Sequence, residues 1–240
     1  MTPPHSLVTG GNRGLGLALV RALLARGDHV VATCRHPGKA TDLNRLVGDH
    51  PGRLHLLPLD VADPKSQAEL ARELPLVLGE QGDGTPGRLD LLVNNAGVLH
   101  SGERFGKVEP RMLEDSFRTN AMGPFLLTQA LAPLLADGAR VANISSELGS
   151  IASLGRFGTP SYNISKAALN MATGLLGFAL AERGVIVLAL HPGWVQTDMG
   201  GQSATVTAED SANGLLRVIE GASSGDSGTF RDWRGQVQSW

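Results

Sequence analysis

A phenol and an ammonium group stand four positions apart in the sequence, at Tyr162 and Lys166. In a helix, this spacing brings both side chains to the same face. A free phenol has a pKa of about 10, too high for ready proton exchange near neutral pH, and a nearby cation lowers that pKa. We therefore expect Tyr162, the only tyrosine of the chain, to act as general acid or base in carbonyl–alcohol interconversion, assisted by Lys166.

A Tyr–Lys pair alone is more often an ordinary feature of a helix surface, so its surroundings decide the interpretation. Here the pair lies in a predicted helix over residues 161–182. A predicted strand over 139–145 precedes that helix and leads into Ser145 and Ser146. This placement favours a catalytic pair over a surface pair.

A glycine-rich turn follows the first predicted strand and leads directly into a predicted helix. It reads Thr9-Gly10-Gly11-Asn12-Arg13-Gly14-Leu15-Gly16. Glycines in such a turn let the backbone approach a pyrophosphate, which lies at the positive N-terminus of the helix. A glycine-rich turn can also be purely structural, but the strand–turn–helix context favours a dinucleotide site. The cofactor-binding candidates of this turn are Gly10, Asn12, Arg13, Gly14, Leu15 and Gly16.

The end of the second predicted strand, 29–34, indicates which dinucleotide fits. A carboxylate there would bind the ribose hydroxyl of NAD, whereas an arginine accommodates the 2′-phosphate of NADP. The strand ends without a carboxylate and is followed by Arg35, and Arg13 supplies a second cation. We expect NADP(H) to be favoured, with NAD(H) possible. The alternative is that both arginines are solvated surface charges.

Two further strand ends suit a dinucleotide. Asp60 and Val61 follow the third strand, where a carboxylate could meet the adenine amino group. Asn94, Ala96 and Gly97 follow the fourth, where small residues would let the backbone lie along the cofactor. The histidines show no metal-ligand spacing, so no metal site is predicted.

The elements that must position these residues alternate between strands and helices. Short apolar runs predict strands over 6–9, 29–34, 54–60, 89–94, 139–145, 185–191 and, weakly, 228–231. Helical spacing and cap residues predict helices over 15–26, 64–78, 110–135, 161–182 and from Thr207 to about Ile219, with Pro124 and Pro133 kinking or ending parts of the third. We expect an α/β fold, a doubly wound Rossmann domain with a parallel sheet of about seven strands and helices on both faces. Residues 1–240 read as a single domain, with 79–87 as a loop insertion.

Composition excludes other classes of protein. The net charge is −2 and no basic cluster resembles a nucleic-acid contact. No stretch approaches the roughly 18 apolar residues that span a bilayer. Residues 1–6 show no secretory pattern, and the single cysteine, Cys34, suits a reducing compartment. We expect a cytoplasmic protein that binds neither nucleic acid nor membrane.

Taken in order, the motifs resemble the short-chain dehydrogenase/reductase family. They are Thr9 to Gly16, Asn94-Asn95-Ala96-Gly97, Asn120, Asn143-Ile144-Ser145-Ser146, Tyr162 to Lys166 and His191-Pro192-Gly193. The segment from His191 to Gly201, with Gly228-Thr229-Phe230, Trp233 and Trp240, resembles the carbonyl-reductase branch that includes the Sniffer and C-factor proteins.

The resemblance implies a role for each matching residue. Ser146 would hold the substrate oxygen, Tyr162 would transfer the proton, and Lys166 would bind the nicotinamide ribose and lower the tyrosine pKa. Asn120 would anchor a water of the proton relay. Both Tyr162 and Lys166 would also contact the cofactor. Further cofactor contacts would come from the segment after the sixth strand, at Pro192, Gly193, Val195 and Thr197.

One spacing departs from the family pattern. Ser146 lies 16 residues before Tyr162, slightly further than in many members. Either the loop 147–160 is longer or another serine serves. Ser145 should point to the other side of its strand and Ser150 lies beyond the strand end, so Ser146 is retained.

The predicted function is that of an NADP(H)-dependent reductase of a small or medium, fairly apolar ketone, aldehyde or quinone. Two alternatives are a dinucleotide-binding regulatory or signalling protein of C-factor type and an NAD-dependent alcohol dehydrogenase. Family habit implies a homodimer or homotetramer, with the helices over 110–135 and 161–182 pairing through small residues such as Gly174 and Gly177. The same small residues could instead pack against the sheet.

Overall fold

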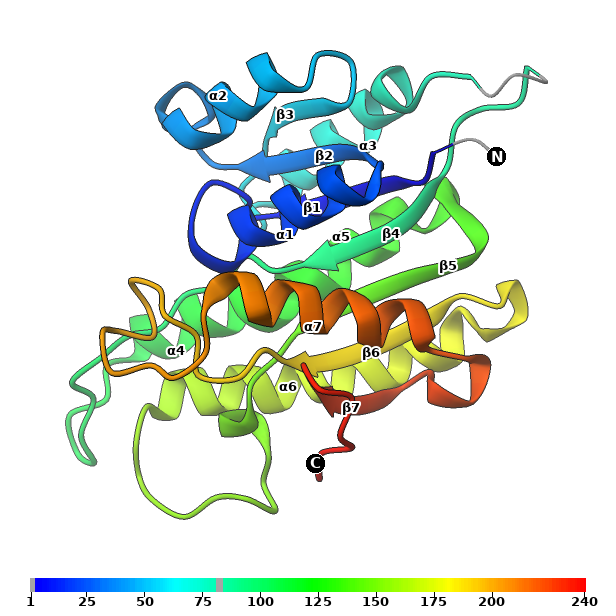
Figure 1. The fold of residues 1–240 in the computed structure, drawn as a ribbon. Coiled ribbons are helices and arrows are strands. Elements are labelled where there is room, and N and C mark those ends of the chain that lie inside the picture. Colours follow the sequence, from blue (N-terminus) through cyan, green and yellow to red (C-terminus); the bar gives the residue numbers. More distant parts are fainter. Residues whose placement is uncertain (1–2, 81–83) are drawn as a thin grey trace.

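The computed structural model describes residues 3–80 and 84–240, which contain one sheet of seven parallel strands in the order β3-β2-β1-β4-β5-β6-β7 (Figure 1). Its strands are β1 (His5–Thr9), β2 (His29–Cys34), β3 (Leu54–Pro58), β4 (Leu89–Asn94), β5 (Leu135–Ile144), β6 (Ile186–His191) and β7 (Thr229–Asp232). The central strands are almost continuously apolar and buried, as a sheet covered on both faces requires. The predicted fold class is confirmed.

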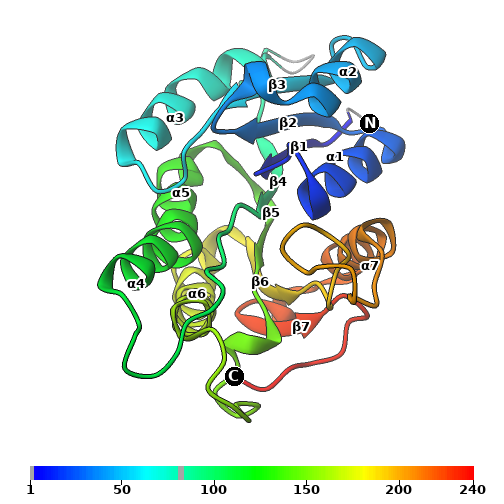
Figure 2. The ribbon, with the colours of Figure 1, turned by 90° about the vertical axis from the view of Figure 1, so that its left-hand side faces the viewer.

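Helices cover both faces of the sheet (Figure 2). They are α1 (Gly14–Arg26), α2 (Thr41–Asp49), α3 (Pro64–Leu78), α4 (Pro110–Phe117), α5 (Gly123–Leu131), α6 (Pro160–Ala179) and α7 (Ala208–Gly221). One apolar core joins α1, α2 and α7 to the sheet, and a second joins α3, α5 and α6 to the other face. Helix α4 packs against α6.

The strand order reverses between β1 and β4, which are neighbours in the sheet although β2 and β3 lie between them in the chain. The loops that leave the two strands therefore run to opposite faces of the sheet. This is where open α/β sheets bind ligands, outside the carboxyl ends of the strands. The glycine turn after β1 and the Asn94–Gly97 segment after β4 meet at this crevice.

One expected helix is divided and shorter than expected, and one further helix was not expected. The helix expected over 110–135 is divided into α4, a π-helical turn at Arg118–Met122 and α5, and Leu135 already belongs to β5. Prolines explain both breaks, because a proline lacks the N–H that would continue the α-helical hydrogen bonds. Pro124 directly follows the π turn, and Pro133 lies in the 3-10 turn that ends α5. Helix α2 was not expected at all: it has nine residues, only one of them buried.

Several local expectations hold. Gly27 ends α1 in the left-handed conformation, with φ +104°, and the Thr207 side chain accepts a hydrogen bond from the Asp210 N–H at 3.0 Å, capping α7. Residues 81–83 of the loop insertion expected at 79–87 lie outside the described residues. The same holds for residues 1–2 of the segment 1–6, in which no secretory pattern was expected.

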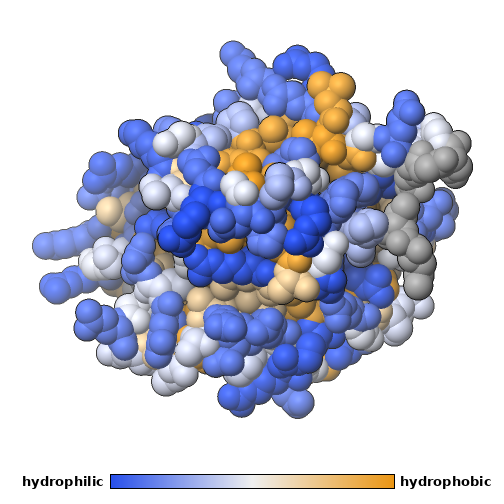
Figure 3. Space-filling view, turned by 45° about the horizontal axis from the view of Figure 1, so that its top comes forward, coloured by the Kyte–Doolittle hydropathy of each residue, from blue (hydrophilic) through white to orange (hydrophobic). Residues whose placement is uncertain are grey.

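The outer surface is mainly polar on the face drawn in Figure 3, where apolar side chains gather only in small areas. Among the described residues, no helix is long and apolar enough to cross a membrane. The same part of the chain contains no group of three or more His, Cys, Asp or Glu side chains that could hold a metal ion.

Candidate active site

The glycine turn is packed so tightly that side chains would not fit at key positions. A Cβ on Gly16 would lie 2.2 Å from the Gly10 carbonyl oxygen, and one on Gly10 would lie 3.0 Å from the Cα of Ala96. Gly10 and Gly14 have φ of +67° and +53°, the left-handed region that favours glycine. The backbone thus reaches the start of α1 by a path that only these glycines allow.

Two polar residues that sequence reasoning did not single out fix this turn to β4. The Thr9 hydroxyl oxygen accepts hydrogen bonds from the backbone N–H groups of Asn95 and Ala96, both at 3.0 Å. The Asn95 amide donates to the carbonyls of Thr9 at 2.9 Å and Gly10 at 3.2 Å. Both residues belong to motifs that the sequence shows, T-G and N-N-A-G. The sequence does not show that they bond to each other, because they lie 86 residues apart.

Asn94 is placed differently from its neighbour. Its side chain is buried in the sheet, where the amide donates to Asn143 at 2.8 Å and to Thr128 at 3.1 Å. Asn94 thus ties β4 to β5 and α5 through its Nδ2, while its Oδ1 is buried without a hydrogen-bond partner in the described structure. The small residues Ala96 and Gly97 beyond it form the open side of the crevice.

The N-terminus of α1 is suited to an anion. No side chain caps it, and its first turn contains no acidic residue. Free N–H groups and the positive end of the helix dipole are the features that bind phosphates. Asn12, Arg13 and Leu15 lie at this turn, and the Arg13 guanidinium forms an exposed ion pair with Asp198 at 2.8 Å.

The outer part of the crevice carries Arg35 and Asp60. Arg35 is exposed at the end of β2, and it has no hydrogen-bond or ion-pair partner among the described residues. Asp60 follows β3 and accepts a hydrogen bond from the Ala62 N–H at 3.0 Å, while Val61 is buried. The carbonyl of Val61 accepts from the Gln67 amide at 2.7 Å. These contacts fix the segment that follows β3.

Tyr162 and Ser146 face each other across the start of α6. The Ser146 side chain lies near enough to the Tyr162 hydroxyl to lower the pKa of the phenol, and the Ser146 oxygen accepts a hydrogen bond from the Leu148 N–H at 3.2 Å. Ser145 instead donates to the Asn170 side chain at 2.5 Å, and Ser150 donates to Ser153 at 3.1 Å. The structure therefore brings Ser146, and not the other two serines, to the phenol.

Lys166 lies one turn further along α6 and is buried. Its Nζ donates to the Ile144 carbonyl at 2.7 Å and lies 5.5 Å from the centre of the Tyr162 ring. A Cβ on Gly97 would lie 3.8 Å from Nζ. Lys166 thus stands between the phenol and the Gly97 side of the crevice.

Burial controls the electrostatics of this pair. Removal from water raises the pKa of Tyr162 to about 12, opposed only in part by the hydrogen bond to Ser146. It lowers the pKa of Lys166 to about 7. The expected lowering of the tyrosine pKa by Lys166 is therefore not found, because burial is the largest cause and raises that pKa. Both groups favour their neutral forms, so the phenol carries its proton at neutral pH.

Asn120 lies in the π-helical turn and joins α4–α5 to the site. Its Oδ1 accepts from the Val98 N–H, and its Nδ2 donates to the Val98 carbonyl, both at 2.8 Å. Nδ2 also donates to Ser165 at 3.0 Å. Because residue 124 is a proline, the Asn120 carbonyl cannot accept the usual hydrogen bond from four residues ahead.

The segment after β6 closes the crevice on the glycine side. The Pro192 carbonyl accepts from Ser211 at 2.7 Å, and Gly193 has φ +82° beside Trp233. Val195 is buried and bridges to Val206. A Cβ on Gly14 would lie 3.1 Å from the Thr197 side chain, which accepts from the Gly200 N–H at 3.1 Å. The segment from Pro192 to Thr197 therefore reaches the glycine turn that leads into α1.

Apolar side chains are exposed on the loops around the tyrosine. Phe105 and Phe157 come from two different loops and make an edge-to-face contact with ring centres 5.8 Å apart. Exposed apolar side chains are also found at Leu148, Ile151 and Leu154, before Tyr162, and at Trp194 and Met199, after β6. An apolar molecule would find contacts on these loops.

Comparison with known proteins agrees with this geometry. Residues 4–207 match the family model for short chain dehydrogenases. A carbonyl reductase from chicken fatty liver, solved with NADPH bound, has 38% identity and a TM-score of 0.92, covering 100% of both chains. Carbonyl reductase Sniffer of D. melanogaster has 33% identity, a TM-score of 0.92 and the same coverage. The C-signal protein of Myxococcus xanthus is 44% identical over 156 residues, 64% of this chain and 94% of that one.

The matching region contains the glycine turn, Ser146, Tyr162 and Lys166, and the two solved structures extend the similarity over the whole chain. The protein belongs to the short-chain dehydrogenase/reductase family of oxidoreductases, in its carbonyl-reductase branch.

Proposed function

We propose that this oxidoreductase reduces an apolar ketone, aldehyde or quinone with NADPH, and that Tyr162 supplies the proton. The observation that carries the proposal is the buried Ser146–Tyr162–Lys166 group, placed where the glycine turn and the Gly97 side of the crevice meet. A nicotinamide dinucleotide, when bound, supplies the hydride. The raised pKa of Tyr162 supports the reductive direction, because the phenol holds a proton that it can donate.

Each residue around the tyrosine has a separate role in the proposed reaction. Ser146 lies close enough to the Tyr162 hydroxyl to lower its pKa, so both side chains would bind the same carbonyl oxygen. Lys166 would bind the nicotinamide ribose, and its ammonium would favour the phenolate that proton donation leaves. Asn120 holds Val98 and thereby the loop on the Gly97 side.

The test is consumption of NADPH with a panel of aliphatic, aromatic and quinone carbonyls, followed by nicotinamide absorbance. We expect turnover with apolar members of the panel and product alcohol in equal amount to the NADPH consumed. Binding of NADPH without turnover of any carbonyl would contradict the proposal. The enzyme is expected to act in the cytoplasm on small molecules.

The second proposal concerns the choice of cofactor, for which Arg35 is the main determinant. An exposed guanidinium at the end of β2, free of other partners in the described chain, is available to a 2′-phosphate. Replacement Arg35→Asp should lower the ratio of NADPH to NADH affinity by about 10–100-fold, the loss of one or two charge-assisted hydrogen bonds. Titration of both cofactors measures this ratio.

Arg21→Asp is the matched control, because Arg21 is exposed on α1 and the charge change is the same. It should leave the ratio unchanged. An NAD-dependent alcohol dehydrogenase would show the opposite result, with tighter NADH binding in the unaltered protein and little effect of Arg35→Asp.

A signalling role is the alternative that one observation favours, namely the similarity to the C-signal protein. A protein that signals through cofactor occupancy alone would need neither Ser146 nor Tyr162. Retention of both in a buried hydrogen-bonded arrangement supports catalysis.

We further propose that the enzyme is a homo-oligomer that pairs through α6. Ile164, Met171, Leu175 and Phe178 form an exposed apolar stripe along that helix. Of the small residues expected to permit pairing, Gly177 packs inside the chain, where a Cβ would lie 3.1 Å from the Gly228 nitrogen.

Phe178→Asp should lower the molecular mass seen by light scattering to that of the monomer. Leu76→Asp, a similar change at an exposed residue of α3, should not.

A further inference from the structure

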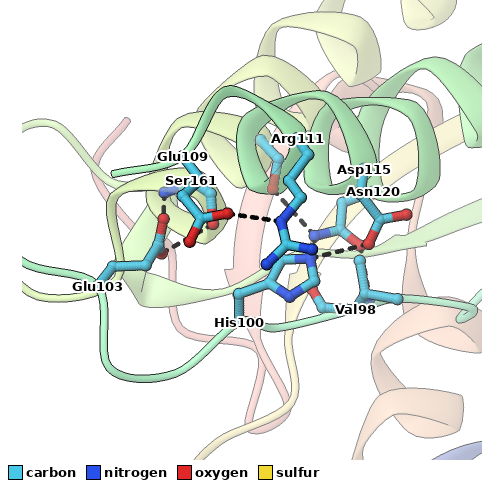
Figure 4. A network of polar contacts seen from close by, with 9 residues as sticks. Val98, His100, Glu103, Glu109, Arg111, Asp115, Asn120 and Ser161 are labelled. Carbon is cyan, nitrogen blue, oxygen red and sulfur yellow. Dashed lines mark hydrogen bonds and ion pairs between the residues drawn. The ribbon is translucent and has the colours of Figure 1, made fainter. Parts of the chain in front are cut away.

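The catalytic helix α6 is capped by a residue far away in the sequence. Glu103 Oε2 accepts a hydrogen bond from the Ser161 hydroxyl at 2.8 Å and from the Ser161 N–H at 3.3 Å (Figure 4). The helix begins at Pro160, and its neighbour Thr159 makes no side-chain bond to the backbone of the first turn. The cap therefore comes from the loop between β4 and α4, 58 residues earlier.

Glu103 lies in the loop between β4 and α4, and three contacts hold the part of this loop from Val98 to Glu103. Val98 is held by Asn120, His100 forms a 2.8 Å contact with Asp115 of α4, and Glu103 is held by Ser161 (Figure 4). The first fastening lies next to Gly97 and Lys166, and the last lies next to Tyr162. The loop thus connects the cofactor side of the crevice to the helix that carries the phenol.

The Glu103 carboxylate is only 9% exposed, and its second oxygen, Oε1, is buried without a hydrogen-bond partner in the described structure. Burial of an unpaired carboxylate oxygen is unfavourable. The favourable contribution at this position comes from Oε2, which binds two donors at the positive end of α6. A neutral cap at Thr159 would avoid that unfavourable burial, so stability alone gives no reason for a carboxylate from a distant loop.

We propose that Glu103 is a positioning residue: by holding Ser161, it fixes the first turn of α6 and with it the Tyr162 hydroxyl against Ser146. This inference rests on the proposed function for its kinetic consequence. Tyr162 follows Ser161 directly, so a shift of this turn moves the phenol. Misplacement of a catalytic group by about 1 Å lowers rates up to about 100-fold.

The kinetic test compares Glu103→Ala with Glu103→Gln. Glu103→Ala should lower kcat for carbonyl reduction at least about tenfold, with the affinity for NADPH unchanged, because α1 and the glycine turn are untouched. Glu103→Gln keeps an oxygen that accepts from Ser161 and should restore kcat to within a few-fold of the original. Glu109→Ala removes an exposed carboxylate from the same loop, paired only with Arg111, and should have no effect. Equal losses in Glu103→Ala and Glu103→Gln would overturn the proposal.

A second measurement does not depend on activity. Tyr162 is the only tyrosine, so isotope-labelled tyrosine gives a single NMR signal from its phenol. We expect that signal to shift or broaden in Glu103→Ala and to stay in place in Glu103→Gln and Glu109→Ala. If Glu103→Ala does not fold, Ser161→Ala, which removes one of the two donors, should give a smaller change of the same kind. An unaltered signal in the variant measured would refute the role of Glu103. If the unaltered protein reduces no carbonyl, the proposed function fails, whereas the tyrosine signal still decides on Glu103.

Discussion

Tyr162→Phe is expected to abolish nearly all carbonyl reduction while leaving the fold and most of the cofactor affinity in place. General acid catalysis by a positioned side chain contributes about 10²–10⁴-fold, and the Tyr162 hydroxyl is the protonated oxygen that lies beside Ser146. The ring itself is buried and is kept by phenylalanine. The affinity for NADPH should change by less than about tenfold, the effect of one neutral hydrogen bond. Steady-state kinetics and cofactor titration measure the two quantities separately.

Neighbouring serines provide the control for this result. Ser146→Ala removes the hydrogen-bond partner of the phenol and should also lower kcat strongly. Ser145→Ala removes a hydroxyl that donates to Asn170 instead, and it should leave kcat close to that of the unaltered enzyme. If Tyr162→Phe and Ser145→Ala had the same kinetic effect, Tyr162 would not be the proton donor.

Much of the fold could be predicted because its causes are local in the sequence. Apolar runs of strand length, the glycine at the end of α1 and the cap at Thr207 each act on their own segment. Helix α2 was missed although Leu43, Leu46 and Val47 stand at helical spacing, because it has only nine residues and no side chain caps its N-terminus. Pro124 and Pro133 were expected to kink or end parts of the long helix, but the π turn at Arg118–Met122 was not, because it depends on contacts of Asn120 with Val98 that no periodicity shows.

The candidate site was predicted to the extent that its residues form recognisable motifs. Tyr162, Lys166 and the glycine turn were found in this way. The bonds that fix them, Thr9 with Asn95 and Glu103 with Ser161, join distant segments and need the fold. The pKa shifts of Tyr162 and Lys166 also could not be predicted without the three-dimensional structure. Spacing indicated a cation beside a phenol, but the degree of burial, which decides the direction of both pKa shifts, is a property of packing.

The burial of Lys166 has a measurable consequence for the cofactor-free protein. Its pKa is about 7 in the folded state and near 10.5 when unfolded. Between these values the unfolded chain holds a proton that the folded chain has released, so the free energy of unfolding should rise with pH from 7 to 10. One such proton contributes up to about 1.4 kcal/mol per pH unit. Below pH 7 both states are protonated and this dependence ends.

Lys166→Met should remove this pH dependence and impair the enzyme in two ways at once. Methionine fills a similar volume but donates no hydrogen bond, so the Ile144 carbonyl loses its partner and Tyr162 loses the adjacent ammonium. We expect kcat to fall by about 10²–10⁴-fold and, unlike in Tyr162→Phe, the affinity for NADPH to fall with it. Urea unfolding at several pH values compares the variant with the unaltered protein, so that other titrating groups cancel. Lys65→Met, at an exposed position of α3, is the control and should keep the slope. Identical slopes in the unaltered protein and Lys166→Met would mean that the ammonium remains charged in the folded state, and that it, rather than burial, sets the proton affinity of Tyr162.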